Sequence, residues 1–201
     1  MTGRPPAVVV ALRLEGLALR GHTGGVPIVR CGMGPRRVHK RAPRFADRQG
    51  WVSTGFCGGL APGVRPGDVV VADTVVIGDR RLPVPAGPRL AQRLQATGLR
   101  VHLGPIYAAD AVVHGAQRAR LAAAGHLAVD LESGALGTLA GERPFAIVRA
   151  VVDTADAPLL HPATPLRVWR ALRSLRVVAP QLGAWAKAPE AARGAESEEV
   201  G

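Results

Sequence analysis

The sequence predicts an α/β protein, a three-layer α/β/α sandwich with a central mixed sheet. Three observations predict this class. Short apolar runs alternate with helical patterns along the chain, which is typical of βαβ units. The 25 glycines and 17 prolines are spread along the chain, as many short connections require. Hydrophobic residues make up 47% of the 201 residues, enough for a core of aliphatic side chains.

Seven apolar runs are the predicted strands. They are expected at residues 7–12, 26–31, 51–56, 68–77, 101–113, 127–131 and 145–152. These runs are rich in Val, Ile, Leu or Ala, as strands that are buried on both faces of a sheet require. The longest β-branched run, at 68–77, predicts a central or bent strand.

The segments between these runs predict helices. They are expected at 35–49, 87–98 and 116–124, from Glu132 onward, and at 166–187. The last helix is expected to break near Pro180, because proline has no backbone N–H and clashes with the preceding turn. Residues 1–187 therefore form one domain that ends in a basic amphipathic helix. The segment 188–201 is rich in Ala, Glu and Gly, and predicts a disordered tail.

The charge is strongly positive, with 26 Lys and Arg against 15 Asp and Glu, a formal net charge of +11. Such a balance is typical of proteins that bind nucleic acid, an anionic membrane surface or a phosphorylated ligand. The sequence contains no nucleic-acid motif, no basic block with interleaved aromatics and no zinc-ligand spacing. We therefore expect neither a nucleic-acid partner nor a metal.

Cysteine usage and the N-terminal segment bear on the compartment. Cys31 and Cys57 lie beside glycines in apolar stretches, which is typical of packing residues in a reducing compartment. The apolar run at 7–12 is interrupted by Arg13 and Glu15, so it is too short to span a bilayer, and it lacks a cleavage site. We expect a cytoplasmic protein.

Three carboxylates follow predicted strands, where α/β sheets bind their ligands. They are Glu15, Glu132 and Asp153. Each has a structural interpretation, because acidic residues in a first helical turn favour the helix dipole and aspartates cap helices. The functional interpretation assigns Glu15 to acid–base chemistry, Glu132 to the binding of a vicinal diol, and Asp153 to protonation of a leaving base.

Four motifs in order carry a resemblance. The block STGFCGGL at 53–60, followed by GDVVV at 67–71, resembles a motif of methylthioadenosine/S-adenosylhomocysteine nucleosidases and their nucleoside phosphorylase relatives. The block VDLES at 129–133 is similar to their ribose motif, and RAVVDTAD at 149–156 to their base-binding motif. The turn GMGP at 32–35 matches the turn before the second helix of the family.

This resemblance implies a nucleoside phosphorylase-like fold and cleavage of the N-glycosidic bond of a purine nucleoside, with no metal or organic cofactor. It implies that Glu15 activates a water nucleophile and that Asp153 is the general acid at purine N7. Glu132 would hold the ribose hydroxyls, and Leu131 would pack under the sugar.

The resemblance also implies further contacts and an assembly. The substrate or an anion would contact Gly34, Arg36, Gly55, Phe56 and Gly58, and the base would contact Val113 and Arg149. Because relatives assemble as dimers or larger rings in which neighbouring subunits complete the pocket, a homo-oligomer is expected.

Two departures from the family pattern concern the nucleophile. Ser53 stands where phosphorylases place a phosphate-binding arginine, and Phe56 stands where many relatives have Ser or Thr. Both departures remove phosphate contacts, so hydrolysis is favoured over phosphorolysis. Arg36 or Arg37, beside the glycine turn, would be the compensating anion site if phosphate is the nucleophile.

The last predicted helix is rich in Leu and Arg. Its arginines recur every three residues, at Arg167, Arg170, Arg173 and Arg176. One interpretation is a packing helix with a solvated basic face, and the other is a basic amphipathic segment that contacts a membrane surface.

This ending, together with the short chain, resembles hopanoid-associated phosphorylases, one branch of the family. The resemblance implies release of adenine from adenosylhopane, a lipid-linked nucleoside, in hopanoid biosynthesis. The alternatives are a methylthioadenosine/S-adenosylhomocysteine nucleosidase, a futalosine nucleosidase and a phosphate-dependent purine nucleoside phosphorylase. The alternatives that are not enzymes are a nucleoside-binding module and a membrane-peripheral module.

Overall fold

The computed structural model describes residues 3–158 and 161–188, in which eight strands form one mixed sheet. The strands are β1 (Ala7–Val10), β2 (Ile28–Arg30), β3 (Trp51–Gly59), β4 (Val69–Ile77), β5 (Arg80–Pro83), β6 (Val101–Ala108), β7 (Ala128–Asp130) and β8 (Phe145–Asp153). Five strands close into a ring, because β3 pairs with β8, β8 with β4, β4 with β6, β6 with β7, and β7 with β3.

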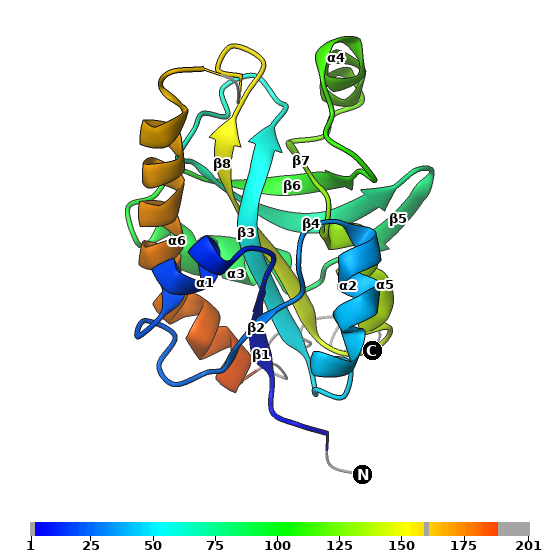
Figure 1. The fold of residues 1–201 in the computed structure, drawn as a ribbon, viewed down its shortest axis with the longest axis vertical. Coiled ribbons are helices and arrows are strands. Elements are labelled where there is room, and N and C mark those ends of the chain that lie inside the picture. The colour runs from blue at the N-terminus through cyan, green and yellow to red at the C-terminus, as the bar shows by residue number, and fades with distance from the viewer. Residues whose placement is uncertain (1–2, 159–160, 189–201) are drawn as a thin grey trace, which may run out of the picture.

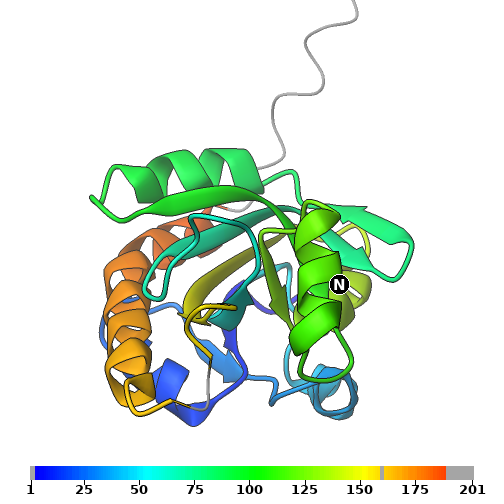
Figure 2. The same cartoon turned by 90° about the horizontal axis from the view of Figure 1, so that it is seen from above.

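Helices cover both faces of this sheet (Figure 1). They are α1 (Arg13–Leu19), α2 (Pro35–Arg41), the 3₁₀ helix η1 (Ala42–Arg44), α3 (Gly87–Gln95), α4 (Gly115–Ala123), α5 (Ser133–Ala140) and α6 (Thr164–Lys187). Buried side chains of α1, α3 and α6 pack on one face, and those of α2 and α5 on the other. Seen from above, α6 and α4 lie on opposite sides of β3 and β8 (Figure 2). The predicted α/β class with a central mixed sheet is confirmed.

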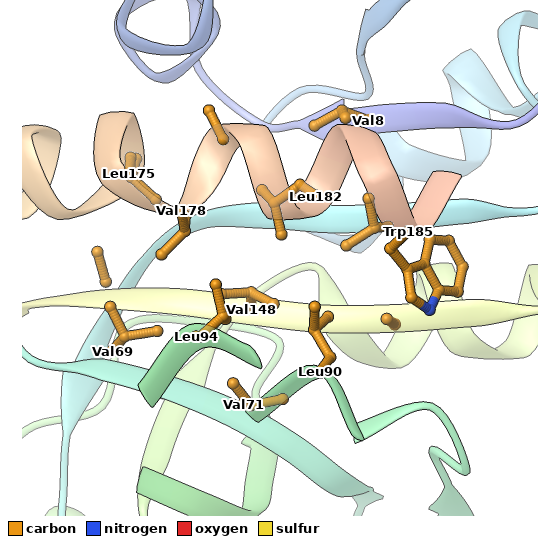
Figure 3. Packing of buried hydrophobic residues seen from close by; sticks show 14 of the residues in the cluster. Val8, Val69, Val71, Leu90, Leu94, Val148, Leu175, Val178, Leu182 and Trp185 are labelled. Carbon is orange, nitrogen blue, oxygen red and sulfur yellow. The ribbon is translucent and has the colours of Figure 1, made fainter. Parts of the chain in front are cut away.

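The strands read as continuous apolar runs because both faces of the sheet are buried. Successive side chains of a strand point to opposite faces, so Val8 and Val10 pack in one core cluster and Val9 in the other. Figure 3 shows the first cluster, where Val148 of β8 lies between α3 and the Leu182 side of α6. This packing fixes the ends of the strands, from which the candidate site is built.

Several predicted elements are shorter than expected, and two of them by the largest margins. The helix predicted at 35–49 ends at Arg41 and continues only as η1, because Pro43 has no backbone N–H to donate to the preceding turn. The strand predicted at 101–113 ends at Ala108. The residues that follow it form a loop, which lies in the wall of the cavity described below.

The predicted break near Pro180 is wrong, since α6 runs unbroken from Thr164 to Lys187. Pro180 is exposed, whereas Val178 and Leu182 on either side are fully buried against the sheet. Proline costs this helix one backbone hydrogen bond, and the buried contacts of both halves hold the helix together.

Other expectations concern α1, β5 and the chain end. The structural interpretation of Glu15 as a first-turn residue agrees with α1, which is otherwise absent from the predicted helices. The polar hairpin strand β5, which pairs antiparallel with β4, is not predicted. The tail predicted at 188–201 lies, apart from Ala188, outside the described residues. Within the described residues, no helix combines the length and the apolar composition needed to cross a bilayer.

The two adjacent valines of α6 test its packing. Val178 is fully buried and Val177 is 42% exposed. We expect Val178→Ala to lower the free energy of unfolding by about 1–3 kcal/mol, because it removes two buried methyl groups and leaves a cavity. Val177→Ala, the matched control, should change it by less than about 0.5 kcal/mol. Urea denaturation measures both, and equal effects would contradict the placement of α6.

Candidate active site

A cavity with about 630 Å³ of empty space, part of it open to solvent, lies at the carboxyl ends of β1, β3 and β8. The loop after β6, the start of α4 and the segment after β7 complete its wall. Of the residues predicted for the site, the cavity is lined by Glu15, Phe56, Gly58, Val113, Leu131, Glu132 and Asp153. The fold thus brings together three carboxylates that are far apart in sequence.

Glu15 lies in the first turn of α1 with its carboxylate turned back toward the end of β1. Its Oε2 accepts hydrogen bonds from the backbone N–H groups of Ala11 (3.0 Å) and Leu12 (2.8 Å), and its Oε1 accepts one from Phe56 (3.0 Å). Glu15 is only 2% exposed, and this burial raises the pKa of its carboxyl. The position of Glu15 in the first turn of α1 agrees with the structural interpretation, and its acid–base role stays a prediction.

Gly55 lies behind the carboxylate of Glu15 rather than in the cavity wall. A Cβ at this position would lie 2.7 Å from Glu15 Oε1, closer than van der Waals contact allows. The glycine of the TG motif therefore lets the backbone of β3 approach the carboxylate. The substrate contact that the sequence predicts for Gly55 is replaced in this geometry by a contact with Glu15.

Glu132 opens α5 directly after β7 and is tied to the glycine turn before α2. Its Oε1 accepts a hydrogen bond from the backbone N–H of Gly34 at 2.8 Å. Burial, and then repulsion by Asp130, raise the pKa of Glu132 to about 7. Gly34 thus orients Glu132 and is not itself in the cavity wall.

Arg149 lies beneath the cavity, 1% exposed, and not in its wall. Its Nε donates to Asp130, and its two terminal nitrogens donate to the hydroxyls of Ser53 and Ser133, at 3.0 Å each. The hydroxyl of Ser133 also donates to Asp130. Arg149, predicted to contact the base, instead has its donors engaged by β3, β7 and α5, because its side chain points into the interior of the sheet.

Asp153 ends β8 and forms an ion pair with Arg118 of α4. Nη1 of Arg118 lies 2.6 Å from Asp153 Oδ2, and both residues line the cavity. Sequence reasoning missed Arg118. The sequence gives no signal for it, because Arg118 and Arg120 both lie in the same alanine-rich segment and only Arg118 is buried.

The remaining candidates are two arginines and two cysteines. Arg36 and Arg37 are exposed on α2, and neither lines the cavity. Burial raises the pKa of the Cys31 thiol to about 12, and burial likewise raises that of Cys57, so neither thiol is an activated nucleophile. In the part of the chain that the structure describes, no group of three or more His, Cys, Asp or Glu side chains is arranged to hold a metal ion.

Known proteins share this sequence pattern and fold. A sequence model of the phosphorylase superfamily matches residues 13–179. A search of curated proteins found no match. Among solved structures, the methylthioadenosine/S-adenosylhomocysteine nucleosidase of Neisseria meningitidis, in complex with methylthio-immucillin-A, has a TM-score of 0.74 and 21% identity, covering 89% of this chain and 98% of that one.

Two further solved structures are similar over comparable lengths. The nucleosidase of Streptococcus pneumoniae, in complex with 8-aminoadenine, has a TM-score of 0.71 and 20% identity, covering 90% of this chain and 99% of that one. A mutant futalosine hydrolase of Helicobacter pylori has a TM-score of 0.72 and 15% identity, covering 93% of this chain and 99% of that one. At these identities the likeness establishes the fold.

The raised pKa of Glu132 predicts a pH-dependent cost to stability. Because the folded state holds this proton up to a pKa of about 7, well above the ordinary value of a glutamate in the unfolded chain, ionising Glu132 destabilises the fold as pH rises through this window. Glu132→Gln avoids that cost and can still accept from Gly34. We expect its free energy of unfolding, relative to the wild type, to rise by about 1–3 kcal/mol between pH 4.5 and 7.5.

Urea denaturation across this pH range measures the difference. Glu142→Gln, at an exposed glutamate, controls for the loss of one acid. A relative stability of Glu132→Gln that stays flat or falls with rising pH would contradict the burial argument.

Proposed function

The chain belongs to the phosphorylase superfamily, and on this premise we propose that it is an enzyme that cleaves the N-glycosidic bond of a purine nucleoside. One observation supports this most. Glu15, Glu132 and Asp153 come from three separate segments and line one cavity with apolar walls. A module that only binds nucleosides does not need an acid placed to protonate a leaving base.

The chemistry assigns one role to each carboxylate. Glu132 accepts hydrogen bonds from the ribose hydroxyls, for which a two-oxygen carboxylate is suited. Glu15 accepts a proton from water as the water oxygen bonds to C1′, and burial raises the pKa of its carboxyl, which makes it a stronger base. The C1′–N9 bond breaks with its electron pair on the base, and Asp153, which must carry a proton when the nucleoside is bound, delivers that proton to N7 and becomes a carboxylate. The carboxylates also stabilise the positive charge that develops on the sugar.

Water is the proposed nucleophile. Among the described residues that line the cavity, Arg118 is the one cation, and its guanidinium is paired with Asp153. Ser53, at the position of the phosphate-binding arginine of phosphorylases, accepts a hydrogen bond from Arg149. Arg36 and Arg37 lie outside the cavity wall. This arrangement favours hydrolysis over phosphorolysis.

For the substrate we propose adenosylhopane, from which the enzyme releases adenine in hopanoid biosynthesis. The rim of the cavity supports an apolar 5′ substituent, because Met33 and Val112 line the cavity and are nevertheless 47% and 58% exposed. Apolar side chains this exposed at the rim of a site are suited to a large apolar ligand. Methylthioadenosine, S-adenosylhomocysteine and futalosine are the alternative substrates.

An apolar and basic face between α1 and α6 supports contact with an anionic membrane surface. Its groove is lined by Leu17, which is 61% exposed, Trp169, which is 52% exposed, and the arginines Arg173 and Arg176. Arg173 stacks over the Trp169 ring at 4.9 Å. Exposed Leu and Trp flanked by arginines are typical of surfaces that lie on anionic lipid.

The homo-oligomer that the family resemblance implies stays a prediction.

A second groove, which α1 forms with β2, lies between this face and the active-site cavity. It shares Leu17 with the first groove and Leu12 with the cavity. A substrate that leaves a lipid surface at α1 and α6 would reach the carboxylates along these adjoining surfaces.

Base release from a panel of nucleosides tests the proposed activity. The panel is adenosylhopane, methylthioadenosine, S-adenosylhomocysteine and futalosine, each assayed with and without phosphate, and free base is measured by chromatography. We expect adenine from adenosylhopane without phosphate. Strict dependence on phosphate would overturn hydrolysis, and a preference for another nucleoside would overturn the proposed substrate. No base from any nucleoside would overturn the proposed function.

Two aspartates of one segment make a matched pair for this assay. Asp153→Asn should bind nucleoside but lose turnover about 10²–10⁴-fold, because the amide cannot deliver the proton to N7. Asp156 is exposed and does not line the cavity, so Asp156→Asn should retain activity. Full activity in Asp153→Asn would contradict the role of Asp153.

Vesicle binding tests the membrane-facing surface. We expect the protein to co-sediment with phosphatidylcholine vesicles that contain phosphatidylglycerol, and less so at high salt, because screening weakens the arginine contacts. The double variant Leu17→Ser and Trp169→Ser should lose this binding. Leu103→Ser, at an exposed leucine of β6, is the matched control. Failure of the wild type to bind anionic vesicles would exclude this surface as a membrane contact.

A further inference from the structure

Arg118 is a buried cation at the active site to which the proposed reaction assigns no role. Its side chain is 11% exposed and that of Asp153 is 14% exposed, in the wall of the same cavity. Removing a guanidinium from water is costly, so a buried arginine requires partners that satisfy its donors. The partners of Arg118 are all at one place, the joined ends of β3 and β8.

Three hydrogen bonds fix the guanidinium. Nη1 donates to Asp153 Oδ2 at 2.6 Å. Nη2 donates to the backbone carbonyl oxygen of Asp153 at 3.1 Å and to that of Gly59 at 2.8 Å. The planar fork of arginine thus holds the side chain and the backbone of Asp153 at once and links both to β3. A lysine, with a single nitrogen, would not span these three acceptors in the same geometry.

The backbone around this contact is irregular. The pairing of β3 with β8 shifts register between Cys57 and Gly58, so that Gly58 lies opposite Asp153. A Cβ at Gly58 would lie 2.9 Å from Nη2 of Arg118 and 3.2 Å from Asp153 Oδ1. A glycine at this position therefore leaves the space that the ion pair occupies. At such a register shift, the backbone hydrogen bonds between β3 and β8 do not by themselves fix the direction of the Asp153 side chain.

We propose that Arg118 is a positioning residue that holds Asp153 in the orientation from which it acts on the leaving base. The contact with Oδ2 leaves Oδ1 beside Gly58, which also lines the cavity. Oδ1 is then the oxygen that faces N7 of the purine. This inference rests on the proposed function, because it assigns Arg118 to the reaction in which Asp153 delivers the proton.

The positioning role predicts a specific division of kinetic effects. Without the contact from Arg118, the Asp153 side chain samples several rotamers, and the orientation needed for proton transfer becomes a minor one. The ribose and the base still bind. The loss therefore falls on the chemical step.

The experiment compares four proteins with the nucleoside on which the wild type is most active. They are the wild type, Arg118→Met, Arg118→Lys and Arg120→Met, which alters an exposed arginine of the same helix. We expect Arg118→Met to lower kcat about 10- to 100-fold and to change KM less than about 3-fold. Arg118→Lys should fall between Arg118→Met and the wild type, and Arg120→Met should match the wild type.

A double variant separates positioning from a purely structural role. If Arg118 acts through Asp153, adding Arg118→Met to Asp153→Asn should lower kcat less than about 2-fold further. If Arg118 only anchors α4, its loss should reduce activity by the same factor in both backgrounds. Circular dichroism and thermal unfolding of each variant identify any that fail to fold, for which Arg118→Lys supplies the comparison.

The outcomes of the two proposals are distinct. A wild type that releases no base from any nucleoside overturns the proposed function, and the role of Arg118 with it. An active wild type with unchanged kcat in Arg118→Met, or with independent effects in the double variant, overturns the role of Arg118 alone.

Discussion

The guanidinium of Arg149 is the charge on which the arrangement of this site depends. Three acidic side chains, Glu15, Asp130 and Glu132, lie buried close to it, and its positive charge lowers the pKa of Glu15 and Glu132 against the effect of their burial. Buried carboxylates without a cation would repel one another in a medium of low dielectric constant. Because β8 is fixed in the ring of strands, the cation stays beneath the cavity while the carboxylates reach it from separate elements. The sheet thus supplies the counter-charge, and the segments after the strands supply the reactive groups.

The charge of Arg149 offsets only part of the effect of burial on the pKa of these carboxyls. The part that is left bears on the proposed function. Burial still raises the pKa of both Glu15 and Glu132, and that of Glu132 to about 7, so both carboxyls are stronger bases than ordinary glutamates. A fully neutralised cluster would be more stable but would hold its carboxylates as permanent ions. Positions where charge repulsion persists in a folded protein are typical of catalytic sites, where function is maintained at the expense of stability.

Most of the sheet and the three carboxylates were predictable from the sequence, and the reasons are local. Strands such as β1 and β8 read as apolar runs because both of their faces are buried, and glycines mark where a backbone approaches a carboxylate, as Gly55 approaches Glu15. Other features depend on tertiary contacts. Arg118 and Arg120 look alike in sequence, and only the placement of α4 over the end of β8 turns one of them toward Asp153. Arg149 shares a motif with Asp153, although its side chain bonds to Asp130 beneath the cavity and does not line the cavity.

The helix α6 illustrates why one sequence pattern supports two interpretations. Arginines every three residues advance about 300° per step around a helix, so the four arginines from Arg167 to Arg176 spread over about half of its circumference. The opposite side carries Leu175, Val178 and Leu182 into the core. The pattern therefore describes a packing helix on its inner side, and this interpretation holds whatever the outer side contacts. What distinguishes a solvated basic face from a lipid-binding one is exposed apolar area, and Trp169 and Leu17 supply that area only because α1 lies beside α6 in the fold.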